Sequence, residues 1–388
     1  MAIIQYDFTY FNNFDFWISK FILSKKKMGS IVSRYRFVSF FLLFIFSYGF
    51  NFAQDNNFVS VSTTPGFLLA HRADLKNLAA HNYGIDVSLE KEKENSHWGS
   101  YYNKPSIGYG LLYYNLGREQ TGHAFGLLSH IKLNLISIRD IDVRFRMGAG
   151  LAYLTKKFDI YENRRNQAIG SHLNGSMQFG IVARKELANS DYIETGISVS
   201  HYSNAAFKVP NLGYNIPSLT LRYGFHNKKQ ISPIAEPIQN INKLTWTTIL
   251  IYGRKQRNFA NPKDFNLWGI QIRGLLNKNS VKSWRFGLDY TIDKSYMHSI
   301  NPDLPADQIA MIDQSELALA GGYQWGFGDV NLIAEMGAYV YKPTILKNAF
   351  SQRLGLAYKI NSQLYTQGML RFHRGVADFF EIGLGYQL

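Results

Sequence analysis

The chain has 388 residues, of which 46% are hydrophobic and 18% charged, so it is long and apolar enough to bury a large core or close a large barrel. It contains no cysteine, which excludes a disulfide scaffold, a thiolate metal site and a cysteine nucleophile. The formal net charge is +14, but no clustered Lys/Arg helix and no nucleic-acid-binding motif accompanies it. Nucleic acid is therefore not an expected partner.

The first informative element is a secretory signal peptide, which we predict over residues 28–53. Arg34 and Arg36 precede an apolar stretch at residues 37–50, and the small residue Ala53 suits cleavage. The 14 residues of the apolar stretch are too few for a helix that spans a bilayer. We therefore expect an exported protein whose mature chain begins near Gln54.

Residues 1–27 lie upstream of this signal, and we interpret them as a start codon assigned too early, with a genuine N-terminal extension as the alternative. Residues 1–53 hold six basic and two acidic side chains, so the processed chain still carries a formal charge of +10. A basic exported protein suits a surface that is rich in anionic phosphate and carboxylate groups.

The rest of the chain alternates between apolar and polar residues. No segment after Ala53 approaches 18 consecutive apolar residues, which excludes spanning helices. Apolar residues occupy every second position in several runs, of which the clearest are residues 141–153, 268–273, 284–292 and 380–388. A soluble sandwich also alternates, but runs of about 10 to 15 residues exceed the usual strand of about five or six and match tilted bilayer-crossing strands.

The sequence therefore predicts an all-β fold: an antiparallel transmembrane β-barrel of about 14–16 strands. The face opposite the apolar one carries charges such as Asp142, Arg144 and Arg146, and we expect them to be solvated in a wet lumen.

The connections between these runs also fit a barrel in an outer membrane, where inner turns are short and external loops long. Counting back from a final strand that descends gives short inner turns near 187–189, 277–281, 326–329 and 360–361, and longer external loops near 157–169, 255–263, 294–313 and 343–348. Residues 226–241, with Pro233 and Pro237, form a long inner connection. This connection predicts a boundary between a first part at 54–225 and additional strands at 242–388 that complete or extend the barrel.

One predicted strand ends in residues with catalytic chemistry. On residues 192–204 the odd positions Ile193, Ile197 and Val199 form the apolar face, and His201 and Ser203 continue its phase. Both should point outward toward lipid, where two residues of one strand face can form a hydrogen bond. The imidazole then takes the hydroxyl proton as the oxygen attacks an ester. The strand count places this pair near the external leaflet.

A third and a fourth polar residue lie close by in the sequence. Asn215 shares the parity of the outward residues Leu219 and Leu221 on the next strand, so it can join His201. An acid at this position would orient the imidazole and stabilise its charged form, whereas an amide can only orient it. Asn204, beside the nucleophile, is a candidate oxyanion donor.

The segment His201-Tyr202-Ser203-Asn204-Ala205, followed by Lys208, Pro210-Asn211 and Gly213, resembles the signature of the lipid A 3-O-deacylase (PagL-like) or acyloxyacyl hydrolase family. Gly170-Ser171-His172-Leu173-Asn174 adds weaker support. The resemblance implies that the N-terminal part is an eight-stranded deacylase barrel, with His201 as base, Ser203 as nucleophile and Asn204 as oxyanion contributor. Two features depart from the family: its catalytic Glu falls on Asn215, and its barrel is about half as large as this chain.

Glu381 is a second candidate for the missing acid. It belongs to a terminal segment in which His373 and Ala377 repeat the spacing of His201 and Ala205, as in a decayed repeat. However, His373 and Glu381 fall on the polar, inward face of their strands. The phase therefore predicts that neither of them meets His201 outside the barrel.

The main functional prediction is an outer-membrane esterase that hydrolyses an acyl ester of lipid A, the anchor of lipopolysaccharide, through an acyl-serine intermediate. Its expected surroundings are outer-membrane lipids, and neither a metal nor an organic cofactor is implied. His71, His81 and His123 show no metal-ligand spacing. Two alternatives stay open: a porin-like or transport barrel, and a structural or adhesion barrel that displays residues 294–313. The sequence does not predict the oligomeric state.

Overall fold

The protein is described by a computed structural model that covers residues 57–93, 96–103, 105–227, 240–257, 262–296, 310–343 and 348–388. The predicted signal peptide at 28–53 and the segment before it lie outside the described residues, as do residues 228–239 of the predicted connection. In the ranges given above, no helix combines the length and the apolar character needed to cross a membrane.

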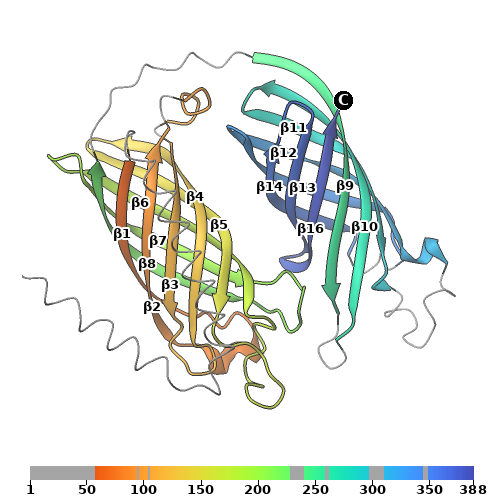
Figure 1. Cartoon of the computed structure of the whole chain (residues 1–388), viewed down its shortest axis with the longest axis horizontal. Coiled ribbons are helices and arrows are strands. Elements are labelled where there is room, and N and C mark those ends of the chain that lie inside the picture. Colours follow the sequence, from red (N-terminus) through yellow and green to blue (C-terminus); the bar gives the residue numbers. More distant parts are fainter. Residues whose placement is uncertain are drawn as a thin grey trace, which may run out of the picture. The chain divides into compact units, whose positions relative to one another are not determined.

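The first half of the chain forms a closed barrel of eight antiparallel strands (Figure 1). Their bounds are β1 (Asn57–Phe67), β2 (His81–Glu92), β3 (Ser106–Asn115), β4 (His123–Ile138), β5 (Ile141–Leu154), β6 (Leu173–Glu186), β7 (Tyr192–Ser203) and β8 (Tyr214–Asn227). Each strand pairs with the next, and β8 pairs with β1, as in the register Val59 to Phe225. A 3₁₀ helix, η2 (Ala73–Leu78), lies between β1 and β2.

The second half forms another closed eight-stranded barrel (Figure 1). Its strands are β9 (Asn240–Gln256), β10 (Asp264–Asn279), β11 (Lys282–Asp293), β12 (Ser315–Phe327), β13 (Val330–Tyr341), β14 (Phe350–Lys359), β15 (Leu364–His373) and β16 (Val376–Gln387), with the 3₁₀ helix η4 (Met311–Gln314) before β12. β16 closes on β9 through pairs such as Leu384 with Leu250.

This closure corrects one expectation. The strands after residue 242 do not complete or extend the first barrel, because β1 and β8 already pair with each other and leave no free edge there. The sequence predicts an all-β antiparallel fold and about 14–16 strands, and the described residues form sixteen strands divided between two barrels. Alternation marks each strand but does not say which strands close on one another.

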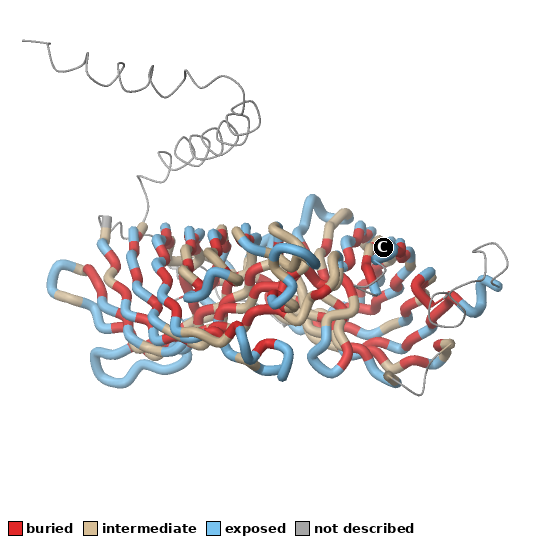
Figure 2. The backbone as a smooth tube through the Cα atoms, turned by 90° about the horizontal axis from the view of Figure 1, so that it is seen from below, coloured by how far each residue is buried: buried red, intermediate tan, exposed pale blue. Residues whose placement is uncertain are grey.

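Along the strands, inward and outward residues alternate, which Figure 2 shows as alternating buried and exposed segments. On β7 the outward Ile197 has 62% of its surface exposed, whereas Glu194 and Ser200 on the opposite face have none exposed. The predicted phase of this strand is therefore confirmed. Outward apolar side chains form the surface that a barrel in a membrane presents to lipid.

The predicted inner turns at 187–189, 277–281, 326–329 and 360–361 coincide with the connections β6–β7, β10–β11, β12–β13 and β14–β15. Because each barrel has an even number of strands, its chain enters and leaves at one end, and each of these four turns lies at that end of its own barrel. We call the opposite end external. In the first barrel it carries the connections 68–80, 116–122, 155–172 and 204–213.

Apolar side chains fill the external part of the first lumen. Leu75 and Leu78 of η2 have no exposed surface and belong to a buried cluster with side chains that project inward from the strands. Its strand members include Leu112, Tyr114, Leu128, Leu154, Tyr202, Tyr214 and Ile216. The external mouth of this barrel is thus closed by packing.

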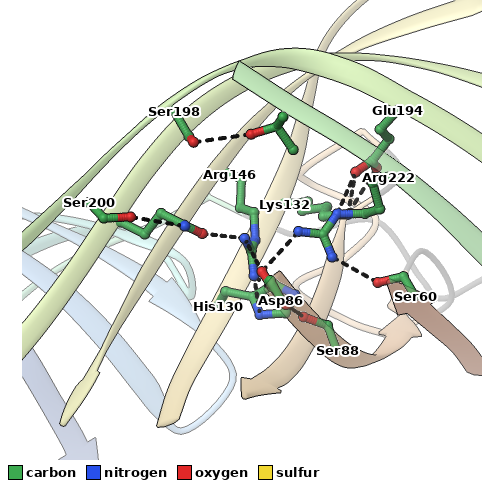
Figure 3. A network of polar contacts seen from close by, with 12 residues as sticks. Ser60, Asp86, Ser88, His130, Lys132, Arg146, Glu194, Ser198, Ser200 and Arg222 are labelled. Atoms are coloured by element: carbon green, nitrogen blue, oxygen red, sulfur yellow. Dashed lines mark hydrogen bonds and ion pairs between the residues drawn. The ribbon is translucent and has the colours of Figure 1, made fainter. Parts of the chain in front are cut away.

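An ionic network occupies another part of the same lumen (Figure 3). Arg222 lies 2.9 Å from Asp86 and 3.3 Å from Glu194, and Lys132 lies 2.7 Å from Glu194. All four side chains are buried. An eight-stranded barrel is only just wide enough for its own side chains, so opposite charges meet across it.

This packing contradicts the expected wet lumen. Asp142, Arg144 and Arg146 are buried rather than solvated, and Arg146 contacts Asp86 at 2.8 Å. The second lumen follows the same rule: Arg353 lies 2.6 Å from Asp289, and Arg273 lies 3.0 Å from Glu335. Alternation predicted the inward charges correctly, but their pairing depends on the barrel diameter.

Candidate active site on the outer wall of the first barrel

The predicted site residues lie at the external end of β7 and β8. His201 of β7 is directly opposite Asn215 of β8, and on the other side Ser203 is opposite Gly175 of β6. His201 and Ser203 continue the outward phase of Ile197 and Val199, which are both exposed. His201 is half-buried, and Ser203 keeps 9% of its surface exposed.

A short hydrogen bond joins two of these residues. The distance from His201 Nδ1 to Asn215 Oδ1 is 2.7 Å. A carbonyl oxygen can only accept, so Nδ1 carries the hydrogen and donates it. In a neutral imidazole the other ring nitrogen, Nε2, is then unprotonated and free to act as a base.

Ser203, the predicted nucleophile, lies two residues after His201 on β7. The predicted hydrogen bond from the Ser203 hydroxyl to His201 is not found among the hydrogen bonds of the described residues, so it stays a prediction. Catalytic hydrogen bonds are often long without substrate and tighten in the complex. On the neighbouring strand, a Cβ at Gly175 would meet only the Ser203 carbonyl oxygen, at 3.3 Å. The wall beside Ser203 therefore carries no side chain at position 175.

Asn204 organises the loop that follows β7. Its backbone N–H donates to Asn211 Oδ1 at 2.9 Å, and its side-chain Nδ2 donates to Ser171 Oγ at 2.9 Å. Its Oδ1 accepts from the backbone N–H of Lys208 at 3.2 Å. Ser171 belongs to the segment 170–174 that the sequence marked as weaker support. These bonds bring the two motif segments together.

Gly213 gives the imidazole its place. Its backbone φ is +77°, a region that side chains disfavour. A Cβ there would lie 2.8 Å from His201 Cε1, closer than packing allows. A larger residue at this position would therefore displace the imidazole from Asn215.

His71 is a contact that the sequence reasoning missed. Asn215 Nδ2 lies 3.1 Å from His71 Nδ1, and His71 Nε2 lies 3.2 Å from the Leu212 carbonyl oxygen. From the sequence, His71 was assessed only as a possible metal ligand. The signal that finds it is the pairing of β1 with β8, because this pairing carries the loop after β1 past residue 215.

An apolar groove of about 770 Å³ lies along the wall next to the site. Its lining includes Phe179, Ile181, Ile197, Val199 and Leu219. In the register of β7 and β8, the pairs Val199 with Pro217 and Ile197 with Leu219 follow the pair His201 with Asn215 away from the external end. The groove thus lies along the outer wall next to the polar pair, and His201 and Asn215 are not part of its lining.

His373 and Glu381 of the terminal segment project inward, as their phase predicted. Glu381 is fully buried and lies 3.2 Å from Arg353 of the second lumen, while its Oε1 accepts from Gln271 at 3.0 Å. His373 is also buried. Glu381 is therefore committed to an ionic network of its own barrel. In the part of the chain that is described, no group of three or more His, Cys, Asp or Glu residues is arranged to hold a metal.

Two protein families match the sequence. Residues 83–225 match "Lipid A 3-O-deacylase (PagL)", and residues 244–388 match "Acyloxyacyl hydrolase, C-terminal domain". These ranges cover most of the first barrel and nearly all of the second. No curated protein matches the chain.

Several solved structures are similar. The crystal structure of the outer membrane enzyme PagL is 21% identical, with 43% of this chain and 98% of that chain covered and a TM-score of 0.31. CdiB from Acinetobacter baumannii is 8% identical, with coverage of 86% and 60% and a TM-score of 0.18. A mutant of the Rh. blastica porin is 8% identical, with coverage of 86% and 99% and a TM-score of 0.17.

Proposed function

Because the chain belongs to the lipid A 3-O-deacylase and acyloxyacyl hydrolase family of outer-membrane β-barrels, we propose that its first barrel hydrolyses an acyl ester of lipid A through a serine nucleophile. In this proposal Ser203 is the nucleophile, His201 the base, Asn215 the residue that orients the base, and Asn204 an oxyanion donor. The substrate is lipid A or lipopolysaccharide in the surrounding outer leaflet.

The observation that carries this proposal is the 2.7 Å hydrogen bond from His201 Nδ1 to Asn215 Oδ1 on the outward face of β7 and β8. This hydrogen bond leaves His201 Nε2 as the basic nitrogen, and Ser203 follows His201 by two residues on the same strand. An ester carbonyl of a lipid beside the barrel can reach this position without entering the lumen.

The reaction follows from these groups. Ser203 Oγ forms a bond to the ester carbonyl carbon while its proton passes to His201 Nε2. The tetrahedral intermediate then collapses, the bond from carbon to the alkoxide oxygen breaks, and the imidazolium returns the proton to this leaving oxygen. Water then attacks the acyl-serine and gives a proton to His201. The bond from the acyl carbon to Ser203 Oγ breaks, the imidazolium returns the proton to Oγ, and the fatty acid leaves.

Asn204 can contribute to the oxyanion without losing its role in the loop. The amide nitrogen has two hydrogens, and the bond to Ser171 engages one of them. A donor that is already fixed by its neighbours stabilises developing negative charge without reorganising during the reaction. The bonds from Asn204 to Ser171, Asn211 and Lys208 provide this rigidity.

The apolar groove supplies a place for the acyl chain. Burial of methylene groups against Phe179, Val199 and Leu219 would hold the ester at the external end beside Ser203. Each methylene moved into such a groove from water contributes about 0.8 kcal/mol, and less when it comes from lipid. The groove therefore positions the chain rather than extracting it from the membrane.

The transport alternative has less support in the described residues. A porin needs an open lumen, whereas the first lumen holds the apolar cluster around Leu75 and Leu78 and the ionic network around Arg222. These side chains occupy the path that a solute would take. The adhesion alternative depends on residues 294–313, of which 297–309 lie outside the described residues.

The test is mass spectrometry of lipid A from cells that express the protein, its Ser203→Ala variant or its Ser200→Ala variant. Ser200 is a matched control because it lies on the same strand but is buried in the lumen. We expect a loss of acyl chains with the parent protein and the Ser200→Ala variant, and unchanged lipid A with Ser203→Ala. Identical acyl patterns in cells with and without the parent protein would reject the proposal.

A further inference from the structure

The loop after β1 reaches the candidate site through one side chain. His71 is exposed, and its two ring nitrogens face different partners. Nδ1 lies 3.1 Å from Asn215 Nδ2, and Nε2 lies 3.2 Å from the carbonyl oxygen of Leu212. The backbone N–H of Leu69 also donates to the Asn215 carbonyl at 2.9 Å, which fixes this loop beside β8.

These contacts together favour one direction for each hydrogen bond. The Leu212 carbonyl can only accept, so His71 Nε2 carries a hydrogen and donates it. In a neutral His71, Nδ1 is then an acceptor, and it receives a hydrogen from Asn215 Nδ2. With Nδ2 facing His71, Asn215 Oδ1 faces His201 and accepts from its Nδ1.

The direction matters because an amide, unlike a carboxylate, has one donor end and one acceptor end. If the Asn215 amide were rotated by half a turn, Nδ2 would face His201 and would need an unprotonated Nδ1. The hydrogen of His201 would then be on Nε2, and this nitrogen could not accept the serine proton. The tautomer of the base thus depends on which way the amide points.

We propose that His71 is a positioning residue that holds the Asn215 amide in the orientation required for His201 to act as a base. The inference rests on the proposed esterase function and adds a residue to it. A carboxylate at position 215 would accept from His201 with either oxygen and would not need this support. His71 therefore compensates for the amide that stands at 215 in this chain.

One further contact of His71 competes with the hydrogen bond from Asn215. His71 Nδ1 is also 3.4 Å from the Leu69 carbonyl oxygen. A hydrogen on Nδ1 could be donated there, but it would oppose the N–H of Asn215. The shorter contact to Asn215 and the contact from Nε2 to Leu212 both favour the tautomer with Nε2 protonated.

The kinetic test uses purified protein in outer-membrane lipid vesicles that contain lipid A. We expect His71→Ala to lower kcat about tenfold with little change in KM, because the amide loses the hydrogen bond that selects its orientation. His71→Asn is the matched control, since its Oδ1 can take the place of Nδ1 and preserve most of the activity.

A double-mutant cycle separates this role from a structural one. In the background Asn215→Asp, which keeps the size of the side chain, removal of His71 should change kcat less than twofold, where twofold corresponds to about 0.4 kcal/mol. An equal loss in both backgrounds would show that His71 merely stabilises the loop, and an unchanged kcat in His71→Ala alone would also overturn the proposal.

A second measurement does not depend on activity. Nitrogen NMR of protein labelled at histidine distinguishes protonated from unprotonated ring nitrogens. In the parent protein we expect His201 to carry its hydrogen on Nδ1, and in His71→Ala we expect both tautomers. If the protein does not deacylate lipid A but shows this change, the esterase proposal fails while the positioning survives. An unchanged tautomer in His71→Ala would refute the positioning.

Discussion

The seventh strand of each barrel carries a histidine close to its external end, and the two histidines have opposite environments. His201 of β7 is on the outward face and donates to Asn215 on the neighbouring strand. His373 of β15 is buried in the lumen, where its Nε2 lies 2.9 Å from the Tyr339 hydroxyl and its Nδ1 lies 3.9 Å from Asp378. A shift of one residue in the phase of a strand moves a side chain from one face to the other.

The two environments show which face of such a barrel is open to a substrate. The lumen around His373 also contains Arg371, which lies 2.6 Å from Glu316 and 2.9 Å from Asp378. Tyr339 and Asp378 hold this histidine inside the lumen, away from any lipid that surrounds the barrel. On the outer wall His201 has fewer fixed partners, and a substrate in the membrane can approach it. The same residue type is therefore structural in one barrel and a candidate base in the other.

Replacing each of the two histidines tests this contrast directly, and we expect the largest change in activity at His201. We expect His201→Ala to lower the rate of lipid A deacylation by about 10³-fold or more, because it removes the general base. His373→Ala should leave the rate per folded molecule within about twofold, since it changes only the second lumen, and twofold corresponds to about 0.4 kcal/mol. Both rates are measured by release of fatty acid from lipid A in vesicles.

The contrast between a base in the first barrel and a structural histidine in the second is refuted if the two substitutions lower the rate equally. It is also refuted if His201→Ala keeps the rate of the parent protein. The folded fraction of each variant is checked by the shift in electrophoretic mobility that folded barrels show without heating.

The second prediction concerns the networks that fill the two lumens. Arg222→Met removes one of the cationic partners of Asp86 and Glu194, and Arg353→Met removes one partner of Asp289 and of Glu381. Each change removes one buried positive charge from a network of paired charges and leaves its carboxylates only partly compensated, so we expect each to lower the free energy of unfolding by about 3–5 kcal/mol. The measurement is unfolding in urea with the protein in lipid vesicles.

A surface ion pair provides the control for this measurement. Lys185 lies 2.9 Å from Asp140 and both side chains are exposed, so Lys185→Ala should cost much less stability than either change in a lumen. If Arg222→Met and Arg353→Met cost as little as this control, the lumens are wetter than their packing indicates.

The sequence predicts much of the fold because alternation is a local signal. Inward and outward faces and four inner turns follow from the pattern in runs such as 141–153. Closure is not local, because the pairing of Phe58 with His226 joins the first and the last strand of the first barrel, which are far apart in the sequence. No periodicity in one strand reveals such a partner, so one large barrel and two small ones have the same pattern.

The candidate site also has a part that follows from local alternation and a part that depends on barrel closure. The outward phase of His201, Ser203 and Asn215 follows from parity within two adjacent strands. The contact from Asn215 to His71 spans 144 positions and depends on barrel closure, so the sequence alone did not predict it. The burial of Arg144 and Arg146 likewise depends on how narrow the closed barrel is.

The smallest change that we expect is one of stability, and it concerns the inner turns that precede the two seventh strands. Before β7, Asp191 Oδ2 accepts from the Tyr223 hydroxyl at 2.6 Å, and Oδ1 accepts from the His226 backbone N–H at 2.8 Å. Before β15, the neutral Asn361 accepts from the backbone N–H groups of Gln363 and Leu364, at 2.9 and 2.8 Å. A carboxylate holds one turn, and an amide holds the other.

The hydrogen bond from Tyr223, followed by that from the His226 backbone, holds the pKa of Asp191 below its usual value. A lowered pKa in the folded state means that this stabilisation is complete above the unfolded pKa of about 3.9 and is lost as the pH falls through the folded pKa. We therefore expect Asp191→Asn to reduce the decline in stability of the first barrel below about pH 4. Asn361→Ala should weaken the second barrel equally at pH 7 and pH 3, because an amide does not titrate. Urea midpoints at both pH values measure the two effects, and a parallel decline in the parent protein and Asp191→Asn would show that this carboxylate does not contribute.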